Sequence, residues 1–219
     1  MKKSLLAVSL ITLSLAIAGA AEKKTEPIKL PAPQMDKGQP LMQTLKNRQS
    51  RRNFAPDKLS LQELGNLLWA ACGVNRPDSG KRTAPTACNW QEIDVYVAMP
   101  DGLYLYNAGE HILAPVLNED VRPLGGKQKF IQTAPVVLIY VADFDKMIRG
   151  SERAPEEQQK FYSATDTGFI SQNVYLYCAS EGLATVVIGM VDKPQLEQKM
   201  KLKPAQHVIL TQPVGFPVK

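Results

Sequence analysis

One apolar run limits what this chain can fold into more than any other feature. The segment PVVLIYVADF, residues 135–144, is rich in Val and Ile and apolar along most of its length. Such a run is typical of a central strand that is covered on both faces. The chain has 219 residues, which is ample for a sizeable core and suits one domain. The sequence therefore indicates a single domain built around this strand.

A group of shorter strands is predicted upstream. Residues 93–99, IDVYVAM, alternate in the manner of a half-buried strand. Asp101 and Gly102 are typical of a turn, after which residues 103–106, LYLY, return beside the first strand. A further strand, HILAPV, is predicted at residues 111–116. Strands joined by such short connections predict an antiparallel meander.

Two capping boxes predict where helices begin. Ser60 with Glu63 precedes leucines at helical spacing, and Ser163 with Asp166 precedes a longer helix that ends at Gly182. The longer helix is nearly apolar all round in the sequence. We expect it to be central, packed by the sheet on one side and by a partner chain on the other.

The N-terminus is typical of an exported protein. Residues 1–20 combine Lys2 and Lys3 with an apolar run and a small-residue end, which predicts a cleaved signal peptide. The alternative is a membrane anchor, but the apolar run is short and interrupted by Ser and Thr, which favours cleavage. Residues 21–37 are polar and rich in proline, so they predict a flexible tether ahead of a domain at 38–219. The expected location is periplasmic or secreted, with no membrane association after cleavage.

Charge and composition exclude several classes of protein. Loss of the two signal lysines lowers the formal net charge from +5 to +3, and the scattered basic residues do not predict a nucleic-acid surface. Cys72, Cys88 and Cys178 form no CxxC pair, so neither a disulfide framework nor a zinc site is expected. We expect Cys72 and Cys178 to be packing residues. With only His111 and His207, no histidine-rich metal site is possible, and both are interpreted as surface or structural residues rather than general bases.

Three polar clusters remain as candidate sites. The run RQSRR, residues 48–52, follows a short amphipathic segment at 40–47 and suits an anion, although a plain basic surface patch is the alternative. Residues 84–91, APTACNWQ, place hydroxyl and amide groups in a turn where they can face a planar polar ligand. Residues 187–190, VIGM, offer a glycine where a flat ring can approach bare backbone. The alternative there is an ordinary buried strand edge.

The order of these clusters resembles the nitroreductase family of FMN-dependent oxidoreductases. The chain has Arg-x-Ser-x-Arg-x-Phe, then Pro-Thr-x-x-Asn-x-Gln, then a late helix ending in GL and followed by IG. The resemblance covers residues 40–217, and GLYLYNAGEHIL and TGFISQNVYLYCASEGL are similar to the branch containing thiazole- and oxazole-forming dehydrogenases. It implies an α+β sandwich, mainly an antiparallel sheet wrapped by helices. It also implies an intertwined homodimer that holds FMN at the subunit interface.

The resemblance also implies the residues that bind the cofactor. Arg48, Ser50 and Arg52 are expected to hold the FMN phosphate and ribityl chain and to reach the pyrimidine edge, with Gln49 assisting through its backbone. Guanidinium groups suit this task because they give bidentate, charge-assisted hydrogen bonds to a phosphate. Arg51 falls at a variable position of the family and is expected to be a solvated charge.

Two further pairs are expected at the flavin ring. Thr86 and Asn89 are implied to face the ring edge, while the backbone N–H groups of Ile188 and Gly189 are implied to meet N5 and O4. A fixed donor at N5 tunes the atom that receives and gives the hydride. No catalytic general acid is assigned, and no metal is expected.

The expected activity is hydride transfer in two steps. A reductant such as NAD(P)H reduces FMN at N5, and a small organic acceptor such as a nitroaromatic or quinone is then reduced. Because nicotinamide nucleotides are scarce outside the cytoplasm, the alternative is an exported FMN-binding or carrier protein without NAD(P)H turnover. A third hypothesis is a flavin-free module that binds a phosphorylated or carboxylated ligand. Residues 151–160 are predicted to be either a substrate-selecting lid or a solvated loop.

Overall fold

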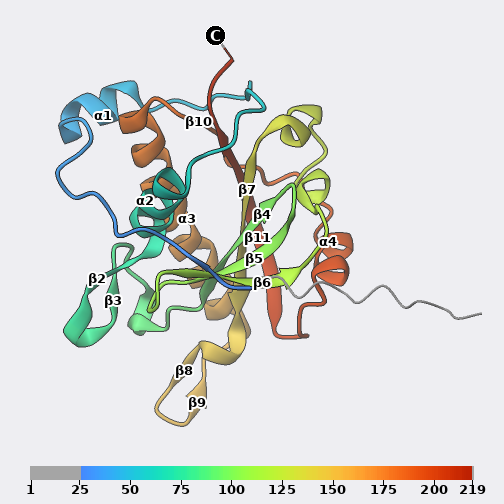
Figure 1. Cartoon of the computed structure of the whole chain (residues 1–219). Coiled ribbons are helices and arrows are strands. Elements are labelled where there is room, and N and C mark those ends of the chain that lie inside the picture. The colour runs from blue at the N-terminus through green and yellow to red at the C-terminus, as the bar shows by residue number, and fades with distance from the viewer. Residues whose placement is uncertain (1–25, 219) are drawn as a thin grey trace, which may run out of the picture.

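The centre of the molecule is a seven-stranded antiparallel sheet with the order β1-β6-β5-β4-β7-β11-β10 (Figure 1). The computed structural model describes residues 26–218, so the predicted signal peptide lies outside the described residues. The strands are β1 Ile28–Lys29, β4 Ile93–Met99, β5 Gly102–Asn107, β6 Ile112–Leu117, β7 Val136–Asp143, β10 Ala184–Thr185 and β11 Gln206–Gly215. The predicted meander is confirmed as β4, β5 and β6.

Strand β7 lies in the middle of this sheet, between β4 and β11. All its residues except Asp143 are buried, because apolar layers cover both faces. Leu138 and Tyr140 belong to one hydrophobic cluster, and Val137 and Ile139 belong to the other. Successive side chains of a strand point to opposite faces, so this apolar run joins two cores. The prediction of a doubly covered central strand is confirmed.

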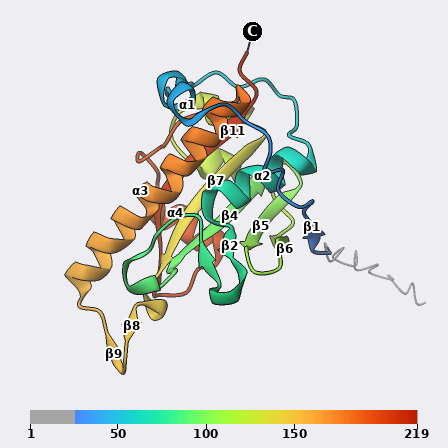
Figure 2. The ribbon, with the colours of Figure 1, turned by 90° about the vertical axis from the view of Figure 1, so that its left-hand side faces the viewer.

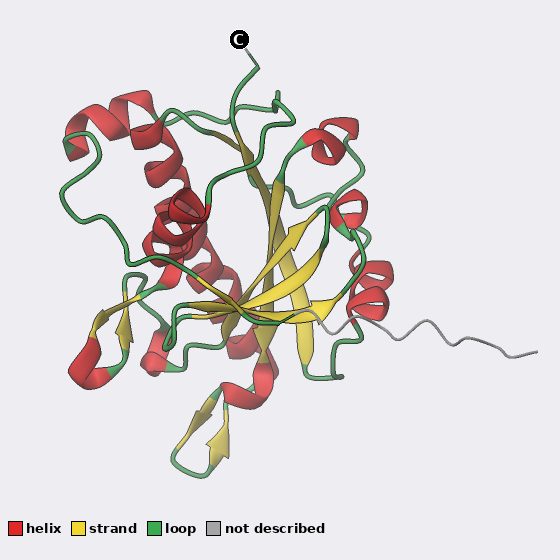
Figure 3. Ribbon diagram, viewed as in Figure 1, coloured by secondary structure: helices red, strands yellow, loops and turns green. Residues whose placement is uncertain are grey.

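Helices cover both faces of the sheet (Figures 1 and 3). They are α1 Leu41–Asn47, α2 Leu61–Cys72, α3 Glu156–Glu181 and α4 Lys193–Met200. Helices α2 and α3 contribute Leu67, Leu68 and Ile170 to one cluster, while α4 contributes Leu196 to the other. Figure 2 shows α3 crossing the whole face of the sheet. The expected α+β architecture, an antiparallel sheet wrapped by helices in a single domain, is confirmed.

Short elements complete the described chain. Two hairpins lie outside the main sheet, β2 Val74–Arg76 with β3 Lys81–Arg82 and β8 Ile148–Arg149 with β9 Glu152–Arg153. Five single turns of 3-10 helix are η1 Pro77–Ser79, η2 Ala87–Asn89, η3 Arg122–Leu124, η4 Lys129–Thr133 and η5 Phe144–Lys146. Among residues 26–218 there is no helix whose length and apolar character would suit a membrane span.

One of the two predicted capping boxes is present. At the start of α2, the Ser60 hydroxyl accepts a hydrogen bond from the Glu63 N–H at 3.2 Å, and the Glu63 carboxylate accepts one from the Ser60 N–H at 2.7 Å. Each side chain thereby satisfies a backbone donor that the helix itself leaves free. This local pattern depends on no distant contact.

The other predicted capping box is wrong. Helix α3 begins at Glu156, directly after Pro155, so Ser163 and Asp166 lie inside it and are buried. Acidic residues in the first turn favour this earlier start through the helix dipole. The buried face of α3 is mixed: Ile170, Val174 and Cys178 are buried as expected, but the helix is not apolar all round, since it also buries Gln159, Ser163, Asp166, Thr167 and Ser171. The predicted end is confirmed, since Gly182 caps α3 with φ 73°.

The segment expected to be a free tether is attached to the domain over its described residues. Ile28 of β1 pairs with Leu113 of β6, and the buried Leu30 donates its N–H to the His111 carbonyl at 3.1 Å. The Gln62 amide donates to the Ala32 carbonyl at 2.9 Å. The proline-rich composition indicates extended chain, but one buried leucine and these hydrogen bonds bind it to the sheet edge and α2.

Candidate functional site

The arginine cluster follows α1 in an extended conformation. Arg48 ends the helix with φ −60° and ψ 120°, and the Arg51 N–H donates to the Thr185 carbonyl at 3.0 Å. Alternate side chains of an extended segment point to the same side. Arg48 and Ser50 accordingly both lie against Tyr175 of α3, whereas no contact among the described residues places Arg52 with them.

Tyr175 of α3 joins two of the three predicted clusters. Its hydroxyl accepts a hydrogen bond from the Val187 N–H at 2.9 Å and lies 3.0 Å from the Ser50 hydroxyl. The guanidinium carbon of Arg48 lies 5.3 Å from the centre of the Tyr175 ring, within cation–π range. One side chain thus fixes the arginine segment beside the VIGM segment. Tyr175 could not be identified as a site residue from the sequence, because helical spacing marks it only as one more residue of a helix.

A hollow of about 550 Å³ opens beside Tyr175, between α1 and the C-terminal turn of α3. Arg48, Gln49 and Arg51 line it. Arg51, expected to be a solvated charge, is exposed and also borders the hollow, whereas Arg52 is exposed and does not line it. Among residues 26–218, no salt bridge involves any of the three arginines. Their charges are therefore free to bind an anion.

The two backbone donors predicted at the flavin ring differ in availability. The Ile188 N–H donates to the Thr211 carbonyl at 2.8 Å, and the Thr211 N–H donates back at 3.1 Å. A β-bridge therefore already uses the Ile188 N–H in this chain, and the assignment of Ile188 to the ring stays a prediction. Gly189 is exposed, and its N–H enters no hydrogen bond among the described residues. A Cβ at Gly189 would meet only Leu210, at 3.7 Å, so the backbone is open to a ligand.

The third cluster forms a tight loop at η2. Three residues of this cluster have positive φ angles although none is a glycine: Cys88 at 51°, Asn89 at 54° and Gln91 at 50°. This conformation is strained for such residues, and such strain is common at functional sites. The Thr86 hydroxyl accepts from the Gln91 N–H at 3.0 Å, which closes the loop. The exposed Asn89 is held at the tip of this turn.

A single subunit does not bring all three clusters together. The loop is anchored where the Ala87 N–H donates to Asp166, whereas the arginines gather at Tyr175. These anchors are nine residues apart on α3, which corresponds to about 14 Å at ~1.5 Å per residue. Thr86 and Arg48 also line different cavities. The rigid helix therefore separates Thr86 and Asn89 from the arginines within one chain.

Comparison with known proteins decides the family. The model of the nitroreductase family matches residues 45–216. The chain belongs to the nitroreductase family. A protein of Methanocaldococcus jannaschii named as a nitroreductase is 31% identical over 185 residues, which cover 80% of this chain and 90% of that protein.

Solved structures agree with this family. The crystal structure of a Ralstonia eutropha protein described as a nitroreductase is 40% identical and has a TM-score of 0.84, covering 91% of this chain and 93% of that chain. The NADPH:FMN oxidoreductase of Vibrio harveyi, solved with NAD+, is 17% identical with a TM-score of 0.62, covering 82% and 69%. The second similarity shows the fold alone. Membership of the nitroreductase family supports an oxidoreductase activity for this chain.

The chain has a buried pair of carboxyl groups beneath the strained loop. Glu92 and Asp166 are 0% and 2% exposed, and neither oxygen of the Glu92 carboxyl has a hydrogen-bond partner among the described residues. Burial, with the neighbouring Asp166 carboxyl, raises the pKa of Glu92 to about 7. Burial raises the pKa of Asp166 as well. Two close carboxyls in an apolar setting resist double ionisation, so the pair retains a proton near neutral pH.

Proposed function

We propose that this protein is an FMN-dependent oxidoreductase of the nitroreductase family. The observation that carries the proposal is the hydroxyl of Tyr175, which joins Ser50 to the backbone of Val187. This contact holds Ser50 near Val187, two residues before the exposed Gly189, and Arg48 lies against the same tyrosine, which supports a phosphate site close to a backbone that suits a flat ring. A solved protein of the same fold is an NADPH:FMN oxidoreductase, which supports a flavin as the ligand.

The side chains present fit FMN. Arg48 and Arg52 have no acidic partner among the described residues, so both can neutralise a phosphate dianion. Ser50 and Gln49 are exposed beside them and can bind the ribityl hydroxyls. The Gly189 N–H is free among the described hydrogen bonds and can donate to the ring.

A homodimer would complete the site. The loop of Thr86 and Asn89 and the segment of Arg48 are anchored to α3 about 14 Å apart, and Thr86 and Arg48 line separate cavities. A dimer in which one subunit supplies the arginines and the other supplies Thr86 and Asn89 would join them in one site. Helix α3 exposes Phe161 at 63% and Phe169 at 44%, and α1 exposes Met42 at 75%. Large apolar side chains exposed along neighbouring helices are typical of a face that a second chain covers.

The cofactor would supply the redox chemistry. Bound FMN would accept a hydride at N5 from a reductant such as NAD(P)H and pass it to a small organic acceptor such as a quinone or nitroaromatic. The protein's part is to bind and orient the ring and to exclude water. If the chain is exported, as its first twenty residues predict, a different donor would be needed, and a flavin carrier remains the alternative.

Absorbance and binding measurements test the proposal. The purified protein should bind one FMN per subunit, and anaerobic NADH, NADPH or dithionite should bleach the flavin bands. Repeated turnover, in which NADH or NADPH bleaches the flavin bands and a quinone restores them, identifies an oxidoreductase, whereas bound flavin that NADH and NADPH do not bleach identifies a carrier. Arg48→Ala should weaken FMN binding by about 1.5–3 kcal/mol, since it removes a charged partner of the phosphate. Protein that binds no added FMN would refute both flavin functions.

Export can be tested separately. We propose that residues 1–20 are removed during secretion. The N-terminus of the protein recovered from a periplasmic extract, determined by mass spectrometry, should lie near residue 21. Intact Met1 on membrane-bound protein would identify an anchor instead.

A further inference from the structure

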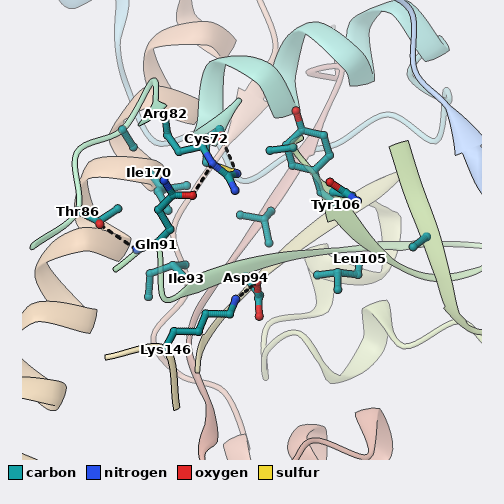
Figure 4. Close-up of a pocket in the computed structure, with 15 residues that line it drawn as sticks. Cys72, Arg82, Thr86, Gln91, Ile93, Asp94, Leu105, Tyr106, Lys146 and Ile170 are labelled. Carbon is teal, nitrogen blue, oxygen red and sulfur yellow. Dashed lines mark hydrogen bonds and ion pairs between the residues drawn. The ribbon is translucent and has the colours of Figure 1, made fainter. Parts of the chain in front are cut away.

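A second cavity lies beneath the strained loop, apart from the arginine hollow. Its volume is about 280 Å³, and it is enclosed by the end of α2, the loop before β4, strands β4 to β6, and α3 (Figure 4). The volume is just below the roughly 300–1,000 Å³ found for small-molecule sites. The cavity therefore suits a ligand much smaller than a flavin nucleotide.

Arg82 presents a fixed guanidinium group to this cavity. Its Nε donates to the Gln91 side-chain oxygen at 2.9 Å, and its Nη1 donates to the Cys72 carbonyl at 3.1 Å. Its Nη2 makes no hydrogen bond among the described residues, and Arg82 forms no salt bridge within them. A guanidinium held by neutral partners keeps its charge and its free edge for an anion. The two hydrogen bonds remove most of the entropy cost of ordering it.

The charges of the cavity wall are unbalanced. Lys146 donates to the Asp94 carboxylate at 2.6 Å, and both side chains line the cavity with Arg82 (Figure 4). Two cations thus face one carboxylate, and a ligand with one negative charge would neutralise the wall. The Cys72 thiol is not reactive, because burial raises its pKa to about 12.

The remaining wall is apolar. Ile93, Val95, Leu105 and Ile170 line the cavity between the charged ends. Such a lining favours a ligand with an apolar body, since burial of that body gives roughly 25 cal/mol per Å². A phosphate ion or a sugar phosphate would leave these side chains without a partner.

From these features we propose that the cavity binds a small organic carboxylate with an apolar body, such as an aromatic acid, and that Arg82 holds the carboxylate. The cavity is separate from the hollow lined by Arg48 and Tyr175, although Thr86, which is expected to face the flavin ring, lies on its wall. Arg82 has no assigned role in FMN binding, so the proposal does not depend on bound FMN.

Calorimetry with benzoate and its neutral analogue benzamide tests the site on the full-length chain as purified, with the flavin content measured first. Benzoate should bind one site per chain at least tenfold more tightly than benzamide. Arg82→Gln should abolish this preference, whereas Arg149→Gln, an exposed position in the β8–β9 hairpin, should leave it unchanged. Equal binding of benzoate and benzamide, or a preference that survives Arg82→Gln, would overturn the proposal.

A second variant tests the charge argument even if Arg82→Gln does not fold. Asp94→Asn removes the one carboxylate of the wall and frees Lys146. Benzoate affinity should then rise several-fold while benzamide affinity stays constant. An unchanged or lower benzoate affinity in correctly folded Asp94→Asn would contradict the proposal.

Discussion

The N–H of Ala87 donates a hydrogen bond of 2.8 Å to the Asp166 carboxylate, although the two residues are 79 positions apart. This contact ties the strained loop of Thr86 and Asn89 to the middle of α3. Asp166 in turn lies beside Glu92, whose carboxyl is fully buried. The protonation of this pair is therefore coupled to the position of the loop.

Folding stability should depend on pH through Glu92. The folded protein holds this pKa at about 7, against an ordinary value of 4.5. As pH rises from 4.5 to 7, the unfolded chain releases a proton that the folded chain keeps, so the free energy of unfolding falls across this window. Urea unfolding at pH 5 and pH 8 measures the change. Glu92→Gln keeps the side chain neutral at every pH. The free energy of unfolding of this variant, relative to that of wild type, should therefore be higher at pH 8 than at pH 5. Equal pH slopes for both proteins would contradict the assignment.

Tyr175→Phe should weaken FMN binding several-fold, because it removes the hydroxyl that joins Ser50 to Val187. The loss of stability should be about 0.5–1.5 kcal/mol. Tyr177→Phe is the matched control, since its hydroxyl donates to the Glu63 carbonyl at 3.2 Å and does not line the arginine hollow. It should lower stability by a similar amount without changing FMN affinity. Fluorescence quenching of FMN measures affinity, and similar losses of affinity in both variants would argue against a local role for Tyr175.

Gly189→Ala should reduce FMN affinity while leaving the thermal unfolding midpoint unchanged. The folded chain has space for the methyl group, whose only neighbour within 4 Å would be Leu210. The same methyl group would occupy the position from which a ring approaches the backbone. Titration with FMN and a thermal scan separate the two effects. Unchanged affinity would place the flavin elsewhere.

Mixed dimers should recover FMN binding that neither parent retains. Arg48→Ala and Asn89→Ala each damage both sites of a homodimer if one subunit supplies the arginine and the other supplies the amide. In a mixed dimer, one site regains both side chains and the other loses both. Refolding an equimolar mixture and measuring bound FMN should therefore show partial recovery. No recovery would mean that Arg48 and Asn89 of the same chain serve one flavin.

Features that depend on neighbouring residues could be predicted from the sequence. The α2 capping box, the Gly182 cap and the β4–β6 meander each follow from spacings of a few residues, where steric and hydrogen-bonding preferences act directly. The apolar run of β7 also predicted its burial on both faces, because no other environment accepts so many apolar side chains in succession. The spacing of the arginine, loop and glycine clusters was enough to identify the family.

Tertiary structure decided which of these groups meet. Tyr175 contacts Ser50 across 125 positions, and no local pattern distinguishes it from the other tyrosines of α3. Helix α3 separates Asn89 from the arginines. Asp166, which the sequence suggested as part of a cap, lies inside this helix as a buried anchor of the loop, and Glu92 is fully buried. These outcomes depend on how α3 packs on the sheet, because burial and long-range hydrogen bonds arise only when distant segments come together.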